Sequence, residues 1–109
     1  MDIEVAQGML NLIQKAKADY AAWMGGNNQW MIDEYNAGIS FIEGSKYIKI
    51  VTEHGSQSSV HSFIVKKDGG KFRRGDILKP ASWKAPAMNF ARGNVIDGTL
   101  DRIRWTGAL

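Results

Sequence analysis

The chain has 109 residues and a mass of 12.1 kDa, which suits one domain with a single hydrophobic core. Hydrophobic residues make up 44% of the chain and charged residues 23%, so the composition excludes a wholly disordered protein. Because cysteine is absent, disulfide scaffolds and thiolate zinc sites are excluded too.

Charge is divided unevenly along the chain. Residues 1–44 hold two lysines and six acidic residues, whereas residues 45–109 hold twelve Lys and Arg and five acidic residues. This asymmetry predicts either a polyanionic partner for the basic half or docking of one half on the other.

The N-terminal sequence carries no targeting signal of the common kinds. Asp2 and Glu4 precede the first basic residue, Lys15, which is wrong for a secretory signal. No apolar run approaches the roughly 18 residues that would span a bilayer. We therefore expect no membrane association and a cytoplasmic protein, in the host cytoplasm if the protein is viral.

Residues 2–24 predict an amphipathic helix, because their apolar side chains recur at three- and four-residue steps. Asp2 and Glu4 lie where the positive end of the helix dipole would be, and Gly25-Gly26 supplies a left-handed stop. We expect the apolar stripe to face the core. It consists of Val5, Met9, Leu12, Ile13, Ala16, Tyr20, Trp23 and Met24.

A β-rich region is expected over residues 30–79. Residues 27–37 fit either a short helix or a first strand, and we favour the strand. After Gly38 the apolar period becomes two, which predicts strands over residues 39–43, 46–51, 60–66 and 77–79. Glycine-rich turns separate them, including Asp68-Gly69-Gly70.

Residues 80–94 form an irregular Pro/Trp segment, since Pro80 and Pro86 fix two backbone dihedrals and Pro80 cannot donate to a central ladder. Residues 95–109 regain apolar character as a C-terminal strand or turn region. There, Asp101 to Trp105 alternates and could close the sheet as its last strand.

No motif in the sequence indicates catalysis, a cofactor or a metal. The two histidines, His54 and His61, lack metal-ligand spacing, and we expect surface or core roles for them. Gly69-Gly70-Lys71 lacks the spacing of a phosphate loop. A small hydrolase would need a cleft that holds His61 beside a polarised serine, and it ranks third among our hypotheses.

The segment 66–94 has the composition of a single-strand nucleic-acid surface, in which Lys and Arg follow phosphates while aromatic rings stack on bases. The alternative is an ordinary solvated sheet face, with Trp83 plugging the core under its loop. The candidate phosphate contacts are Lys66, Lys67, Arg73, Arg74, Lys79, Lys84 and Arg92, and the candidate stacking rings are Phe72 and Trp83.

Residues 77–83 (ILKPASW) and 89–94 (NFARGN) resemble a pattern in small bacteriophage proteins, particularly marine ones. The resemblance covers the C-terminal half from Ser59 onward. It implies a viral or environmental origin and carries no activity or site with it.

Together these features predict one α+β domain over residues 1–109, with an N-terminal amphipathic helix packed on a twisted antiparallel sheet of about four or five strands. We expect a non-enzymatic protein that binds single-stranded nucleic acid with weak sequence specificity. The alternative is a phage-type structural or regulatory module that docks on a protein partner through the Pro80–Pro86 loop and Trp83. Exposed sheet edges also allow a homodimer.

Overall fold

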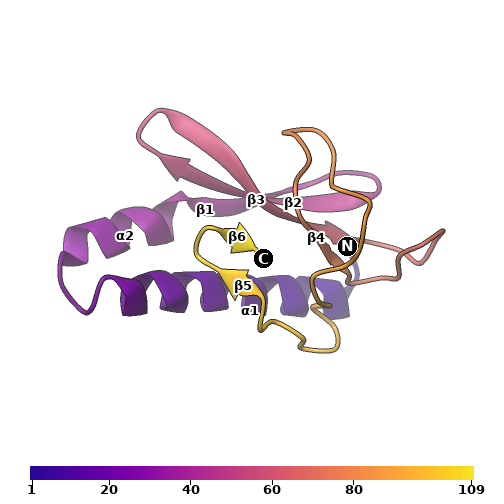
Figure 1. The fold of residues 1–109 in the computed structure, drawn as a ribbon, viewed down its shortest axis with the longest axis horizontal. Coiled ribbons are helices and arrows are strands. Elements are labelled where there is room, and N and C mark those ends of the chain that lie inside the picture. Colours follow the sequence, from indigo (N-terminus) through magenta and orange to yellow (C-terminus); the bar gives the residue numbers. More distant parts are fainter.

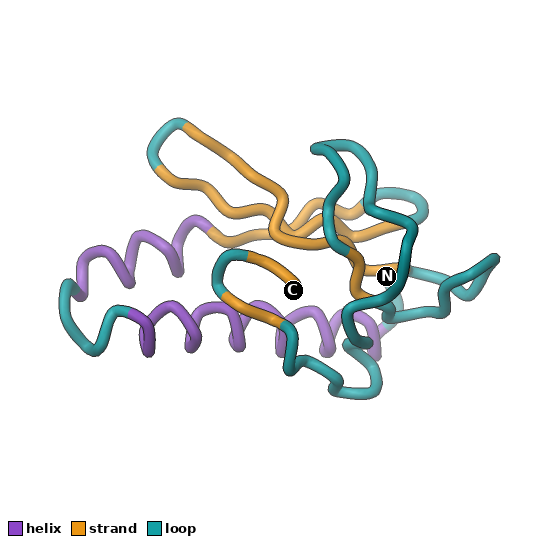
Figure 2. Tube along the Cα trace, in the orientation of Figure 1, coloured by secondary structure: helices purple, strands orange, loops and turns teal.

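The computed structural model describes residues 1–109 and contains two helices and two antiparallel sheets (Figure 1). The predicted α+β class, with a long N-terminal helix against an antiparallel sheet, is confirmed. Figure 2 shows that loops make up most of the chain between the two sheets. The elements are α1 (Ile3–Trp23), α2 (Gln29–Gly38), β1 (Ile39–Glu43), β2 (Tyr47–His54), β3 (Gln57–Val65), β4 (Ile77–Leu78), β5 (Ile103–Arg104) and β6 (Gly107–Ala108).

Helix α1 begins and ends where the sequence predicts. Asp2 is the N-cap, and its Oδ1 accepts a hydrogen bond of 2.8 Å from the Val5 N–H. Beyond Trp23 the chain turns through Gly25 and Gly26, which have φ of +66° and +77°. The buried stripe of α1 packs on the inner face of the sheet, but Trp23 is 67% exposed rather than part of the core.

The strand predicted in residues 27–37 is wrong, because these residues form α2. Asn28 adopts a left-handed conformation, with φ of +57°, and the helix begins after it. A strand would place Trp30 and Ile32 on the same face. In the helix Ile32 is buried while Trp30 is 67% exposed, so the β-rich region starts at Ile39 and not at residue 30. Neither helix has the length and apolar character that crossing a bilayer requires.

The main sheet has strand order β1-β2-β3-β4, and every neighbouring pair is antiparallel. Alternation separates its faces: Ile48, Ile50 and Ile64 point towards α1 in the larger core cluster. Phe63 and Leu78, which oppose each other in the register, lie in a smaller cluster on the outer face. The sheet therefore has one face covered by α1 and the C-terminal residues, and another covered only by the loops after β3.

The C-terminal residues do not extend the main sheet, contrary to the strand considered there. They form the separate β5–β6 hairpin, which Figure 1 shows between α1 and the main sheet. The hairpin approaches the backbone of β3 closely, since a Cβ on Gly107 would lie 3.0 Å from the His61 carbonyl oxygen. Such an approach favours glycine at that position.

His61 connects this hairpin to the main sheet. It lies in a β-bulge, because Ile50 pairs with Ser62 while Val51 pairs with Val60, which leaves His61 without a partner on β2. Its Nε2 lies 2.7 Å from the Arg104 carbonyl oxygen and its Nδ1 2.9 Å from Ser62 Oγ. Since a carbonyl only accepts, the neutral ring carries its proton on Nε2 and accepts at Nδ1 from Ser62.

Stability should fall as pH drops below 6.5. Burial lowers the pKa of His61 below its ordinary 6.5, although the hydrogen bond to the Arg104 carbonyl opposes this. As the pH falls through 6.5, His61 therefore binds a proton in the unfolded chain before it does so in the folded chain. The contribution of neutral His61 to stability is fully present above that pH. We expect a loss of up to about 1.4 kcal/mol per pH unit between pH 6.5 and the lower folded pKa.

Urea unfolding at pH 7.5, 6.5 and 5.5 measures this loss. His61→Gln, although less stable throughout, should lose no stability over that interval. The wild-type loss should precede acid unfolding through Asp2, Glu43 and Asp97, whose lowered pKa values matter only at more acidic pH. A wild-type profile as flat as that of the variant would contradict the assignment.

Candidate nucleic-acid interface

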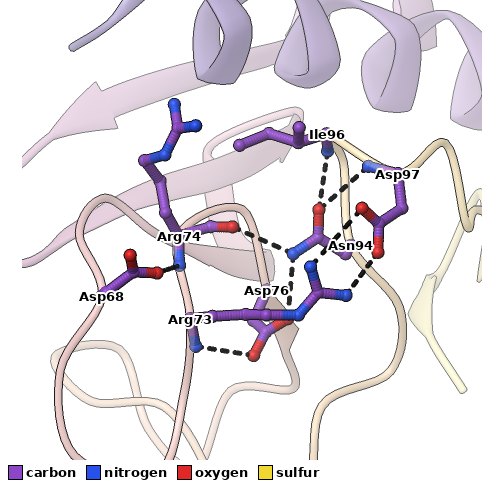
Figure 3. Close-up of polar contacts among 7 residues, drawn as sticks. All are labelled: Asp68, Arg73, Arg74, Asp76, Asn94, Ile96 and Asp97. Atoms are coloured by element: carbon purple, nitrogen blue, oxygen red, sulfur yellow. Dashed lines mark hydrogen bonds and ion pairs between the residues drawn. The ribbon is translucent and has the colours of Figure 1, made fainter.

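The buried side chain of Asn94 joins the turn at Arg74 and Asp76 to the chain at Ile96 and Asp97 (Figure 3). Its Nδ2 donates to the Arg74 carbonyl and to Asp76 Oδ1, both at 3.0 Å. Its Oδ1 accepts from the backbone N–H groups of Ile96 and Asp97 at 2.8 and 3.1 Å. All four hydrogen-bonding positions of the amide are therefore occupied, and Asn94 is only 2% exposed.

The two arginines beside this amide form intramolecular ion pairs. The Arg73 guanidinium pairs with Asp97, so its positive charge is compensated within the chain (Figure 3). The Arg74 guanidinium donates to Asp2 Oδ2 at 2.9 Å and to Glu4 Oε1 at 3.1 Å. These hydrogen bonds raise the pKa of both arginines and lower the pKa of Asp97, while the Val5 N–H and then Arg74 lower that of Asp2.

Lys66 is paired in the same way at the start of the segment. Its Nζ lies 2.8 Å from Glu43 Oε2 and donates to the Gly44 carbonyl oxygen at 2.8 Å. The pKa of Glu43 is lowered to about 2, mainly by its hydrogen bond with Lys66 and next by the amino group of Met1. Together with Arg74, this pair shows the acidic N-terminal half docking on the basic half within one chain.

Two other predicted contact residues are buried, which corrects their expected roles. Phe72 is 7% exposed in the outer cluster with Phe63 and Leu78, so its ring has no free face for a base. Arg92 is also 7% exposed. Its guanidinium carbon lies 3.9 Å above the Phe90 ring and its Nη2 donates to Asn89 Oδ1, so it stabilises the loop rather than reaching a phosphate.

Lys67, Lys79, Lys84 and Trp83 remain exposed, and none of these lysines forms an ion pair. Trp83 is 43% exposed in a loop closed by a bridge between Pro80 and Pro86. The Ser82 hydroxyl accepts from the N–H groups of Lys84 and Ala85 and fixes the turn beside Trp83. The loop after β4 is therefore ordered and presents its ring at the surface.

Two hollows on the outer side of the sheet bring lysines together. One, of about 400 Å³, is lined by Lys46, Lys67 and Lys71, and the next, of about 310 Å³, by Lys46, Lys49 and Lys84. The hollows are adjacent because both also contain Ser45 and Tyr47. We call these five lysines, with Tyr47 and Trp83, the outer basic surface.

Lys49 links the sheet to the loop within this surface. Its Nζ lies 4.3 Å from the centroid of the Trp83 ring and 5.9 Å from that of Phe63, its cross-strand partner. Tyr47 meets Phe63 edge to face, with centroids 5.9 Å apart. Lys71 instead donates to the carbonyls of Met88 and Asn89, so its charge is held by dipoles and not by a carboxylate.

Sequence reasoning missed Lys46, Tyr47 and Lys49, because it treated residues 46–51 only as a strand. The available signal was strand period: Tyr47 and Lys49 alternate with the buried Ile48 and Ile50. The loop that covers this outer face is formed by residues 80–94. Their apolar residues follow no helical or strand period, so their position over the sheet could not be predicted.

The hydrolase hypothesis lacks its cleft. His61 does contact Ser62, but these residues are 2% and 0% exposed, so no substrate reaches the pair. No group of three or more His, Asp or Glu side chains is placed to hold a metal ion.

The chain belongs to a family described as "Family of unknown function (DUF7717)", whose model matches residues 1–108. No curated protein and no solved structure matches it. Membership of this family covers both halves of the chain, so the acidic and basic halves are parts of one family unit.

Asn94→Ala should destabilise the fold by about 2 to 4 kcal/mol, because it leaves the Arg74 carbonyl, the buried Asp76 carboxylate and the N–H groups of Ile96 and Asp97 without their partner. Asn27→Ala is the control: Asn27 is exposed, so its effect should stay within about 0.5 kcal/mol. Urea unfolding monitored by circular dichroism compares the two. Equal stabilities would show that the amide does not hold these segments together.

Proposed function

We propose that the protein binds single-stranded nucleic acid through the outer basic surface. One observation carries the proposal: five lysines without carboxylate partners line two adjacent hollows on the sheet face opposite α1, and one of them, Lys49, lies against the exposed Trp83 ring. Because unpaired ammonium groups attract polyanions and release their counterions, such a surface favours a phosphate backbone.

The arrangement supports a division of roles. Lys46 lines both hollows, and Lys84, which follows Trp83 in its loop, lines one of them with Lys46, so these two would contact neighbouring phosphates. Trp83 would stack on a base, which contributes roughly 1 to 3 kcal/mol per base by alanine substitution. Tyr47 is half-buried and would supply a ring edge. Lysines contact phosphates and rings stack on the faces of any base, so the binding would be weakly sequence-specific.

Lys46→Gln/Lys84→Gln should weaken binding of a fluorescein-labelled oligo-dT measured by anisotropy at low ionic strength. If both lysines contact phosphates, the slope of log K against log salt should fall by about 1.4 in magnitude. Lys15→Gln/Lys17→Gln removes the same charge from α1 on the other side of the sheet and should leave the slope unchanged. Equal losses in both variants, or no salt-sensitive binding by the wild type, would sink the proposal.

A second candidate rests on the ordered Trp83 loop. A half-exposed tryptophan held by a proline bridge is a suitable anchor for a pocket on a protein partner. In that case Trp83→Ala would abolish partner capture while Lys46→Gln/Lys84→Gln would not. The resemblance to phage proteins stays a prediction. A homodimer also stays a prediction, and it could form through the free edge of β1, where Phe41 and Ile42 are exposed.

A further inference from the structure

A further hollow lies near the β2–β3 hairpin, away from the two lysine-lined hollows at the β1–β2 turn. A hollow of about 500 Å³ opens where the end of α1, α2, the β2–β3 hairpin and the C-terminal hairpin meet. This size is within the range of small-ligand pockets. It is lined by Tyr20, Trp23, Met31, Glu34, Tyr35, Thr52, Glu53, His54, Ser59, Trp105 and Thr106.

Four aromatic rings converge on this hollow. Tyr20 stacks on Tyr35 with centroids 4.6 Å apart, and Trp105 meets Tyr20 edge to face at 5.0 Å. Trp23 lies 5.2 Å from Trp105 at 43°, with 67% of its surface exposed. The rings pack against one another along the hollow, Trp23 being the most exposed of them, and we call the hollow with these four rings the aromatic pocket.

Hydrogen bonds fix the Tyr35 ring and the backbone of Trp105 in the aromatic pocket. The Tyr35 hydroxyl donates to the Trp105 carbonyl at 2.7 Å, and the Trp105 N–H donates to Asp19 Oδ2 at 2.8 Å. Because residues 70 and more positions apart in the chain make these bonds, the pocket exists only in the folded protein. Such fixed rings lose little conformational freedom when a ligand binds.

The charge at the pocket is negative, although the protein as a whole carries +3. Glu34 and Glu53 line it, and no lysine or arginine does. His54 lies beside them, with Nδ1 3.2 Å from Glu34 Oε1. Asp19, which holds the Trp105 backbone, adds a third carboxylate behind the rings.

We infer that the aromatic pocket binds an alkylated ammonium group. Ring faces carry negative quadrupole potential, and carboxylates beside them add attraction for a cation. A trimethylammonium group is weakly hydrated and spreads its charge over methyl groups that pack on rings. A neutral sugar would also stack on tryptophan, but it would gain nothing from the charge of Glu34 and Glu53.

Titration with choline chloride tests the inference, with the indole N–H resonances of the four tryptophans followed by NMR at constant ionic strength. Choline should move the Trp23 and Trp105 signals and leave those of Trp30 and Trp83 in place. Its neutral isostere, 3,3-dimethylbutan-1-ol, should bind at least about fivefold more weakly, since it lacks the charge. A short peptide with trimethyllysine distinguishes a protein-borne group from a free one by its tighter or weaker binding.

Trp23→Ala should weaken choline binding at least about fivefold, whereas Trp30→Ala should not change it. The two tryptophans form a matched pair, because both are 67% exposed and only Trp23 lines the pocket. Glu34→Gln should weaken choline but not its isostere. The inference would be overturned if choline and the isostere bound equally, or if a neutral sugar bound better than choline. It would also be overturned if no signal moved up to about 50 mM choline, a molar excess of at least about 50-fold.

Discussion

The buried amide of Asn94 is the contact on which the arrangement of the basic half depends. The loops between β3 and β5 have almost no regular structure of their own, so their backbone polar groups need partners from side chains. Asn94 supplies them from one position. A Cβ on Gly75, whose φ is +92°, would lie 2.8 Å from Asn94 Oδ1, so the neighbouring backbone can approach the amide only at a glycine.

Around this amide the positive charges divide into two groups. Arg73, Arg74 and Lys66 are ion-paired with carboxylates, and three of these carboxylates, Asp2, Glu4 and Glu43, belong to the N-terminal half. Exposed pairs of this kind contribute little to stability, but each removes a cation from the surface that a polyanion would meet. The lysines of the outer basic surface have no such partner. The uneven charge of the two halves of the chain therefore has two consequences: carboxylates of the acidic half pair with part of the basic half, and the remaining lysines leave one positively charged surface.

Sequence patterns predicted what depends on local period and failed where distant residues meet. The α1 stripe, its stop at Gly25-Gly26, and the strand alternation around Ile48 and Ile50 follow from short-range rules. Helix α2 was misread because four apolar residues in ten fit both periods. The pairing of Arg74 with Asp2, 72 positions away, has no local signal, and neither has the convergence of rings from α1, α2 and the C-terminal hairpin. Neither the ion-paired arginines nor the aromatic pocket could therefore be predicted.

The division of the basic residues is tested most directly by mapping bound oligonucleotide on the backbone. In a titration of ¹⁵N-labelled protein with oligo-dT at low salt, we expect the largest amide shifts around Lys46, Trp83 and Lys84. The amides of Arg74 and Asn94 should stay in place. Shifts centred on Arg73, Arg74 and Arg92, with Lys46 and Lys84 unaffected, would contradict it.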